Sequence, residues 1–100
     1  MKWAVVIGPR AERDIENARQ WYEKQQIGLG DRFLDEIGHA VLALKKDANC
    51  FPLYYRRFRR VLLPRFPYKI FFVIEGDRAL VFRILHAKQD HPRRLSSTQA

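Results

Sequence analysis

Three side chains in the second half of the chain could together support chemistry at a phosphodiester: Arg65, Arg83 and His86. Such a reaction needs an acid or base, and cations that stabilise the extra negative charge on phosphorus. An imidazole titrates near neutral pH, so His86 could act as acid or base while the two arginines hold phosphate. The alternative is structural: His86 satisfied by a backbone carbonyl at a strand end, and Arg65 a solvated or partner-contacting charge.

A second group of side chains could bind a polyanion. The formal charge of +8 arises entirely in residues 51–100, where eleven basic residues face three acidic ones. Aromatic residues alternate with arginines over residues 54–60, a combination that suits nucleic acid or a carboxylate-rich protein segment. The candidate residues for binding nucleic acid or a target are Arg56, Arg57, Arg59, Arg60, Lys69 and Lys88.

The four arginines of this group should divide between the two faces of a strand, because side chains alternate along it. Two of them would then lie near the helices and pair with acidic residues there, with Glu12, Glu16, Glu23 and Asp35 as the available partners. The other two would remain available to phosphate or to an acidic segment.

The first half of the chain is expected to form a strand and two helices. A β-branched run over residues 3–7 ends at Gly8-Pro9, which predicts a short strand and then a helix start. Apolar residues at helical spacing predict helices over about 9–26 and 31–46. The short loop between them predicts an antiparallel helical hairpin.

The second half changes to extended runs bounded by turn residues. Three strands are expected, over residues 54–63, 68–74 and 78–85. The polar link at 75–77 predicts that the last two pair as an antiparallel hairpin. The order of elements is therefore strand, helix, helix, strand, strand, strand, which is an α+β pattern.

Length and composition limit the classes of protein that fit. One hundred residues make one domain, expected at 1–92, with 93–100 as a flexible tail. Cys50 has no second thiol, and His39 and His91 lie far from other ligand types, so neither a disulfide, a metal nor a cofactor is expected. The apolar stretch near the N-terminus is too short for a signal peptide or a membrane span, which favours a cytoplasmic protein without a membrane partner.

The chain resembles the RelE/ParE superfamily of bacterial toxins from type II toxin-antitoxin modules, including those of plasmid stabilisation type. The resemblance covers roughly residues 2–92 and rests on four segments: Trp21-Tyr22-Glu23, Gly28-Leu29-Gly30 before Phe33-Leu34, Arg59-Arg60-Val61-Leu62-Leu63-Pro64-Arg65-Phe66-Pro67-Tyr68, and His86. It implies a RelE/ParE-like α+β fold, with an N-terminal strand, a helical hairpin and a three-stranded antiparallel meander in one sheet. It also implies neutralisation by a co-encoded antitoxin in a hetero-oligomer, and growth inhibition by the free toxin.

The superfamily contains two mechanisms. RelE-like members cut messenger RNA on the ribosome without a metal, and by family position Arg65, Arg83 and His86 would carry that reaction. ParE-like members inhibit DNA gyrase, and this hypothesis is favoured slightly because the sequence supplies one plausible acid-base residue. A non-toxic nucleic-acid-binding or regulatory module on the same fold is a further alternative. Many relatives end in His-x-Arg-Asp-Pro and an aromatic residue, whereas this chain continues from His86 as Ala87-Lys88-Gln89-Asp90-His91-Pro92.

Overall fold

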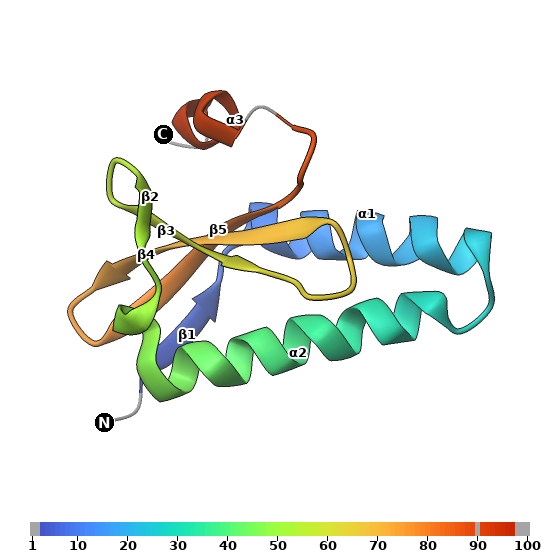
Figure 1. The fold of residues 1–100 in the computed structure, drawn as a ribbon, viewed down its shortest axis with the longest axis horizontal. Helices are drawn as coiled ribbons and strands as arrows, with labels where there is room; N and C mark the ends of the chain where they lie inside the picture. Colours follow the sequence, from blue (N-terminus) through green and yellow to red (C-terminus); the bar gives the residue numbers. More distant parts are fainter. Residues whose placement is uncertain (1–2, 90, 98–100) are drawn as a thin grey trace.

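A five-stranded sheet lies between a pair of long helices and one short helix (Figure 1). The computed structural model describes residues 3–89 and 91–97. In chain order its elements are β1 (Ala4–Ile7), α1 (Pro9–Gln25), α2 (Leu29–Asp47), the 3-10 turn η1 (Ala48–Cys50), β2 (Leu53–Tyr55), β3 (Phe58–Leu62), β4 (Tyr68–Glu75), β5 (Arg78–His86) and α3 (His91–Ser97).

The sheet is mixed, with strand order β1-β5-β4-β3-β2. The first strand pairs in parallel with the last, and all other neighbours are antiparallel. Beyond Ile7 the parallel pairing ends with one further hydrogen bond, in which the Gly8 N–H donates to the Val81 carbonyl at 2.9 Å. The expected α+β class, the initial order of strand, helix and helix, and the hairpin between the last two strands are confirmed.

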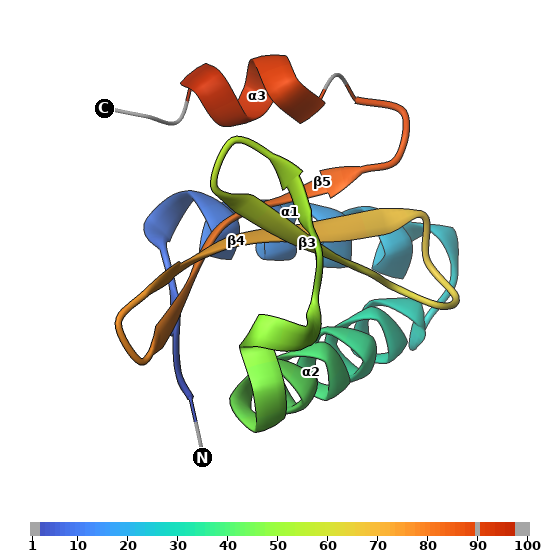
Figure 2. The same ribbon diagram turned by 60° about the vertical axis from the view of Figure 1, so that its left-hand side comes forward.

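The prediction of one continuous strand over residues 54–63 is wrong. The chain reverses at Arg56 and Arg57, so that β2 and β3 form a tight hairpin and four strands follow the helices (Figure 2). Arg56 has a φ of 53°, the left-handed conformation that two-residue hairpin loops require. The dipeptides Asn-Gly and Asp-Gly indicate such a turn in a sequence, whereas two consecutive arginines do not.

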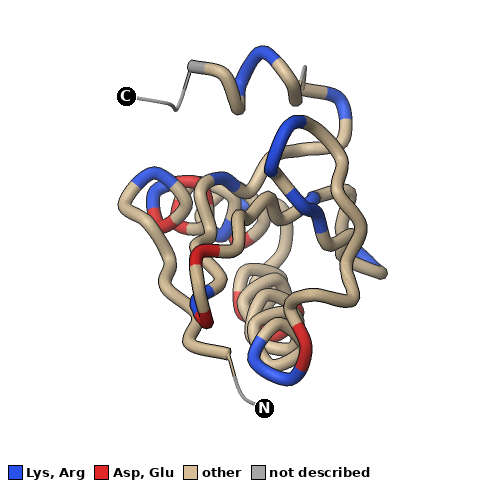
Figure 3. The backbone as a smooth tube through the Cα atoms, turned by 90° about the vertical axis from the view of Figure 1, so that its left-hand side faces the viewer, with Lys and Arg blue, Asp and Glu red and all other residues tan. Residues whose placement is uncertain are grey.

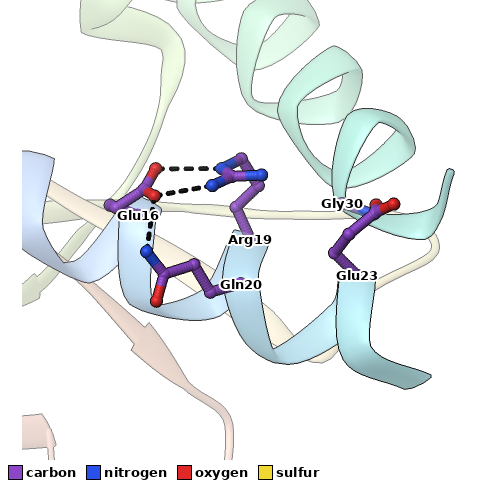
Figure 4. Close-up of polar contacts among 5 residues, drawn as sticks. All are labelled: Glu16, Arg19, Gln20, Glu23 and Gly30. Carbon is purple, nitrogen blue, oxygen red and sulfur yellow. Dashed lines mark hydrogen bonds and ion pairs between the residues drawn. The ribbon is translucent and has the colours of Figure 1, made fainter. Parts of the chain in front are cut away.

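The helical hairpin is closed by a carboxylate that accepts two backbone hydrogen bonds. The N–H groups of Gly28 and Gly30 each donate to Glu23 at 3.0 Å, and Figure 4 shows Glu23 directed at the start of α2. These two donors hold the pKa of Glu23 below its ordinary value. A Cβ on Gly30 would lie 2.8 Å from the Arg19 carbonyl oxygen, so glycine allows the two helices to approach this closely.

Two turns before Glu23 on α1, Glu16 forms an ion pair with Arg19 (Figure 4). The Arg19 guanidinium donates two hydrogen bonds to the carboxylate, and the Gln20 amide donates a third at 2.8 Å. These donors, chiefly Arg19, lower the pKa of Glu16 to about 2. The pair lies at the surface, so its contribution to stability is small.

The sheet has a hydrophobic core on each face, and the two differ in size. The core under α1 and α2 includes Phe33, Leu44 and Phe72 with many smaller residues of the helices and strands. The core under α3 consists of a few buried residues, namely Phe58, Phe71, Val73, Leu85 and Leu95. Successive residues of β4, Phe71 and Phe72, enter opposite cores, as the alternation of a strand requires.

Residues 93–97, which the sequence assigned to a flexible tail, continue the helix that begins at His91, and the Leu95 side chain is fully buried against the sheet. The Tyr55 hydroxyl is hydrogen-bonded to the Ser96 hydroxyl at 2.8 Å, which links α3 to the β2–β3 hairpin. Residues 98–100 of the expected tail lie outside the described residues.

Candidate functional site

Arg83 binds a carboxylate of α1. Its Nε and Nη2 donate to the two oxygens of Asp14 at 2.7 and 3.0 Å, and its side chain is 11% exposed. The register of β4 and β5 shifts between Phe71 and Phe72, and this irregularity accompanies the turn of Arg83 toward α1. Because both carboxylate oxygens of Asp14 accept hydrogen bonds from Arg83, this pair connects the sheet to the helical layer.

Asp14 also accepts the backbone N–H of Ile84 at 2.9 Å. This group lies beyond the end of β1, where β5 has no parallel partner, and a buried N–H without an acceptor would be costly. Sequence reasoning did not identify Asp14. The available signal was its position: it follows Ala11 by three residues and precedes Ala18 by four, so it lies on the apolar stripe of α1.

His86 ends β5 and forms one wall of a small pocket with Trp21, Tyr22, Pro67 and Tyr68. Its Nδ1 accepts a hydrogen bond from the Lys88 N–H at 3.1 Å, which requires Nδ1 to be unprotonated. Nε2 is then the proton-bearing nitrogen. The imidazole of His86 thus accepts a hydrogen bond from a backbone N–H. A purely structural role for His86 was expected to involve a backbone carbonyl.

The neighbouring Tyr68 contributes an aromatic edge to the same pocket, with its ring centroid 5.2 Å from that of His86. Burial raises the pKa of the Tyr68 hydroxyl, and the negative charge of Asp14 adds to the shift. The His86 pocket is therefore mainly aromatic, with the rings of Trp21, Tyr22 and Tyr68 beside the imidazole.

Arg65 lies in the loop before β4, three residues from its start, and its side chain is 86% exposed. It lies at the edge of an open groove of about 750 Å³ between α2 and the β3–β4 loop. Its Nε is 3.8 Å from Glu36, and the Glu36 carboxylate also accepts the Arg65 backbone N–H at 3.2 Å. The groove and the His86 pocket share Tyr22 and Pro67 as lining residues.

Of the three candidate catalytic residues, Arg65 and His86 thus line adjoining hollows, whereas Arg83 is directed to Asp14. The groove is mostly apolar, with charged residues such as Arg32 and Glu36 at its border. Within residues 3–89 and 91–97, no group of three His, Cys, Asp or Glu side chains is placed to hold a metal ion.

The four clustered arginines have different environments, and the expected pairing with acids of the helices is wrong. Arg59 donates to the backbone carbonyls of Asn49 and Phe51, at 3.3 and 2.7 Å. Arg57, in the β2–β3 turn, lies 3.4 Å from Glu75 at the end of β4. Because the chain reverses at this turn, the regular alternation assumed for one strand does not extend to Arg56 and Arg57.

The other two arginines lie over tyrosine rings. The Arg60 guanidinium carbon is 4.2 Å from the centroid of Tyr54, and that of Arg56 is 5.1 Å from Tyr55. Such stacking holds a cation in place and leaves its N–H groups directed at solvent or at a ligand. Arg56 is exposed and Arg60 half-buried.

Lys69 and Lys88 lie on the same side of the sheet as α3. Lys69 is half-buried on β4, in register with Leu62 and Leu85, and Leu85 belongs to the core under α3. Lys88 is exposed in the connection from β5 to α3. The binding candidates thus belong to two groups: Arg59 and Arg57 have hydrogen-bond partners, whereas Arg56, Arg60, Lys69 and Lys88 form no ion pair among the described residues.

His91 is a second residue whose position the sequence did not predict. It is buried at the start of α3, where its Nε2 is 2.8 Å from the His86 carbonyl oxygen. Its ring lies 4.9 Å from that of Phe71 and 6.2 Å from that of Tyr54. His91 therefore fastens α3 to the sheet, which is a structural role.

The described helices are all too short or too polar to cross a membrane. The architecture, a mixed sheet with a helical hairpin on one face, defines the chain as a RelE/ParE-type α+β protein. A solved structure titled "Chromosomal ParDE TA system from P. aeruginosa" is similar, with a TM-score of 0.70 and 20% sequence identity over 85% of this chain and 96% of that one. A search of curated proteins found no match.

The family model described as "ParE toxin of type II toxin-antitoxin system, parDE" matches residues 5–91. The chain therefore belongs to the ParE toxin family of type II toxin-antitoxin systems. The matched range includes β2 to β5, all of β1 except Ala4, the helical hairpin and the three candidate catalytic residues. The expectation of a RelE/ParE-type toxin is confirmed, and ParDE membership implies a cognate ParD antitoxin as partner.

Proposed function

We propose that this ParE toxin arrests growth by inhibiting DNA gyrase without cleaving a phosphodiester. Membership of the ParE family carries the proposal, since gyrase inhibition is the mechanism expected of ParE-like members. The target and the antitoxin both belong to the bacterial interior, so the site of action is the cytoplasm.

The geometry around Arg83 supports a non-hydrolytic mechanism. Stabilising charge on phosphorus requires cations whose donors are available to the substrate. The bidentate contact with Asp14 uses two of the five N–H donors of Arg83 and offsets its charge, and the low exposure of the side chain restricts access to the rest. The endoribonuclease hypothesis then retains Arg65 and His86, with one group able to transfer a proton.

The apolar groove beside Arg65 is suited to the antitoxin. An antitoxin segment that folds on binding must bury apolar surface to offset its loss of conformational entropy. The groove offers the exposed side chains of Leu62, Pro64 and Pro67 for that contact, and Arg32 and Arg65 at its border would pair with acidic residues of the segment.

The test is induced expression of the wild-type chain in a bacterium, with growth, message cleavage and DNA-damage signalling followed together. We expect growth arrest with DNA-damage signalling and without new cuts in messenger RNA. In parallel, the purified chain should inhibit supercoiling by purified gyrase, and an excess of the cognate antitoxin should restore it. Cuts at codon positions on the ribosome would instead establish the endoribonuclease.

His86→Ala and Arg65→Ala are the matched variants for this experiment. For a gyrase inhibitor, loss of the imidazole should leave toxicity within a few-fold of wild type, because no proton transfer is involved. If His86→Ala is folded but harmless and message cleavage disappears with it, the nuclease hypothesis replaces the proposal. A folded chain with no effect on growth, on gyrase or on message would favour a non-toxic binding module.

A further inference from the structure

The face of the molecule that carries α3 is strongly basic. In Figure 3 the cations of the β2–β3 hairpin and of α3 lie near one another, on the side of the sheet away from α2. The contacts of Tyr55 with Ser96 and of Tyr54 with His91 hold these two elements together. We define the α3-side basic surface as Arg56, Arg60, Lys69 and Lys88.

Acidic residues are concentrated elsewhere. The acids of residues 1–50 belong to α1 and α2, where they balance the local cations. Among the described residues of the second half, the acids are Glu75 and Asp77, at the turn between β4 and β5. Glu75 is already in contact with Arg57 and Arg78, at 3.4 and 3.6 Å. Within residues 3–89 and 91–97, Arg56, Arg60, Lys69 and Lys88 form no ion pair with a carboxylate, so they keep their positive charge on this side of the sheet.

Two of these cations are held in position before any ligand arrives. Stacking on Tyr54 and Tyr55 orients Arg60 and Arg56, so less side-chain entropy is lost when they bind. Lys88 is placed by the connection between β5 and α3, where its backbone N–H donates to His86. The surface thus presents positioned cations from a hairpin tip, a strand and the connection between β5 and α3.

The ligand that fits this surface is the phosphate backbone of nucleic acid. A segment that folds on binding needs apolar contact as well as charge, and the groove that supplies it lies between α2 and the β3–β4 loop. A nucleic acid needs only charge, because binding is driven by release of the counterions condensed on its phosphates. We propose that the α3-side basic surface binds duplex DNA through its backbone, without sequence preference and independently of the toxin's target.

The test is fluorescence anisotropy of a short labelled DNA duplex of mixed sequence, titrated with the full chain without gyrase or antitoxin. Four phosphate contacts predict a slope of log affinity against log salt of about −3.6, hence roughly 150-fold weaker binding at about 200 mM than at about 50 mM salt. No detectable binding at the lower salt concentration would overturn the proposal. This result is independent of whether gyrase is inhibited.

A pair of charge-matched variants locates the surface. Arg56→Gln with Lys88→Gln removes two cations beside α3 and should weaken binding at low salt about tenfold and reduce the salt slope by about two. Lys45→Gln with Lys46→Gln removes two exposed cations from the last turn of α2 and should leave binding within about twofold of wild type. Thermal melting checks that both variants are folded.

Two outcomes would contradict the proposal. If the α2 variant loses as much affinity as the α3-side variant, binding depends on net charge and not on this surface. If poly-glutamate displaces the duplex at equal charge concentration, the surface recognises acidic protein segments and does not select phosphate.

Discussion

The two faces of the sheet differ in what covers them and in the charge they carry. On one face α1 and α2, of 17 and 19 residues, enclose an extensive core and contain nearly balanced charges. On the other, α3 has seven residues, the core is small and the surrounding surface is basic. The helical face therefore contributes most of the stability, which leaves the α3 face able to carry uncompensated charge.

Two fully buried leucines on opposite faces allow a direct comparison. We expect Leu44→Ala on α2 to reduce the free energy of unfolding by about 4 kcal/mol, because the packed helices cannot collapse around the cavity. Leu95→Ala on α3 should cost about 2 kcal/mol, because a short helix can shift or separate from the sheet. Urea denaturation of both variants measures the difference.

Hydrogen exchange distinguishes local from global effects in the same variants. Leu95→Ala should lower protection in α3 while protection in α2 and β4 follows the global stability. If both variants lose the same stability and show the same changes in protection, the two faces unfold as one cooperative unit and contribute similarly to stability.

The ion pair between Asp14 and Arg83 connects the helical layer to the sheet. Asp14→Ala leaves the largely buried guanidinium and the Ile84 N–H without their acceptor, so we expect a loss of about 3 kcal/mol in the free energy of unfolding. Chemical denaturation at neutral pH measures it. The change in stability should exceed any change produced at the exposed cations near α3.

The double variant Asp14→Leu with Arg83→Met is the control for this pair. Removing both charges avoids an unpaired buried ion, so the double variant should be more stable than Asp14→Ala. Additive losses, with the double variant the least stable, would mean that the two residues act through separate contacts.

The order of elements was predictable from the sequence because each pattern is local. Helical spacing of apolar residues and the Gly-Pro boundary identified both long helices, and Glu75-Gly76-Asp77 identified the β4–β5 hairpin. The β2–β3 turn was missed because Arg56 adopts a left-handed conformation without the usual turn residues. Helix α3 was missed because it is short and depends on contacts of Leu95 and His91 with a distant sheet.

The residues of the candidate site were predictable as a set, but their individual partners were not. Charge and residue type selected Arg65, Arg83 and His86 together, and only the tertiary fold shows that Arg83 meets Asp14, 69 positions earlier in the chain. Likewise, the arginines of the hairpin differ in role because Arg59 reaches backbone carbonyls and Arg60 reaches a ring. Long-range pairing is a property of topology, which a local pattern does not contain.

Within the helical layer, Glu23→Gln tests the carboxylate that closes the helical hairpin, with a smaller expected effect. The folded state lowers the pKa of Glu23 below its ordinary value of 4.5, so the ionised group stabilises the fold above that pH. As pH falls through the lowered pKa, the carboxylate is protonated and this contribution is lost. Wild type should therefore be more stable than the variant at neutral pH, and the difference should shrink below about pH 4.

Thermal unfolding of both proteins between about pH 3 and pH 7 provides the measurement. Glu16 also makes stability depend on pH in this range, because its pKa is about 2 in the folded state and 4.5 ordinarily, but the effect is the same in both proteins and cancels in the difference. A difference that does not change with pH would mean that Glu23 stabilises the hairpin through its shape and not through its charge.

Arg65 should be the least important of these residues for stability, although it lies in the candidate site. Its side chain is 86% exposed and its contact with Glu36 is long, so Arg65→Ala should change the free energy of unfolding by less than about 0.5 kcal/mol. Any loss of gyrase inhibition or of antitoxin affinity in this variant would then reflect a lost contact. Glu36→Gln removes the partner and keeps Arg65, so it should preserve both activities if the arginine itself makes that contact. A loss of stability of several kcal/mol in Arg65→Ala would instead place this loop among the elements that hold the two layers together.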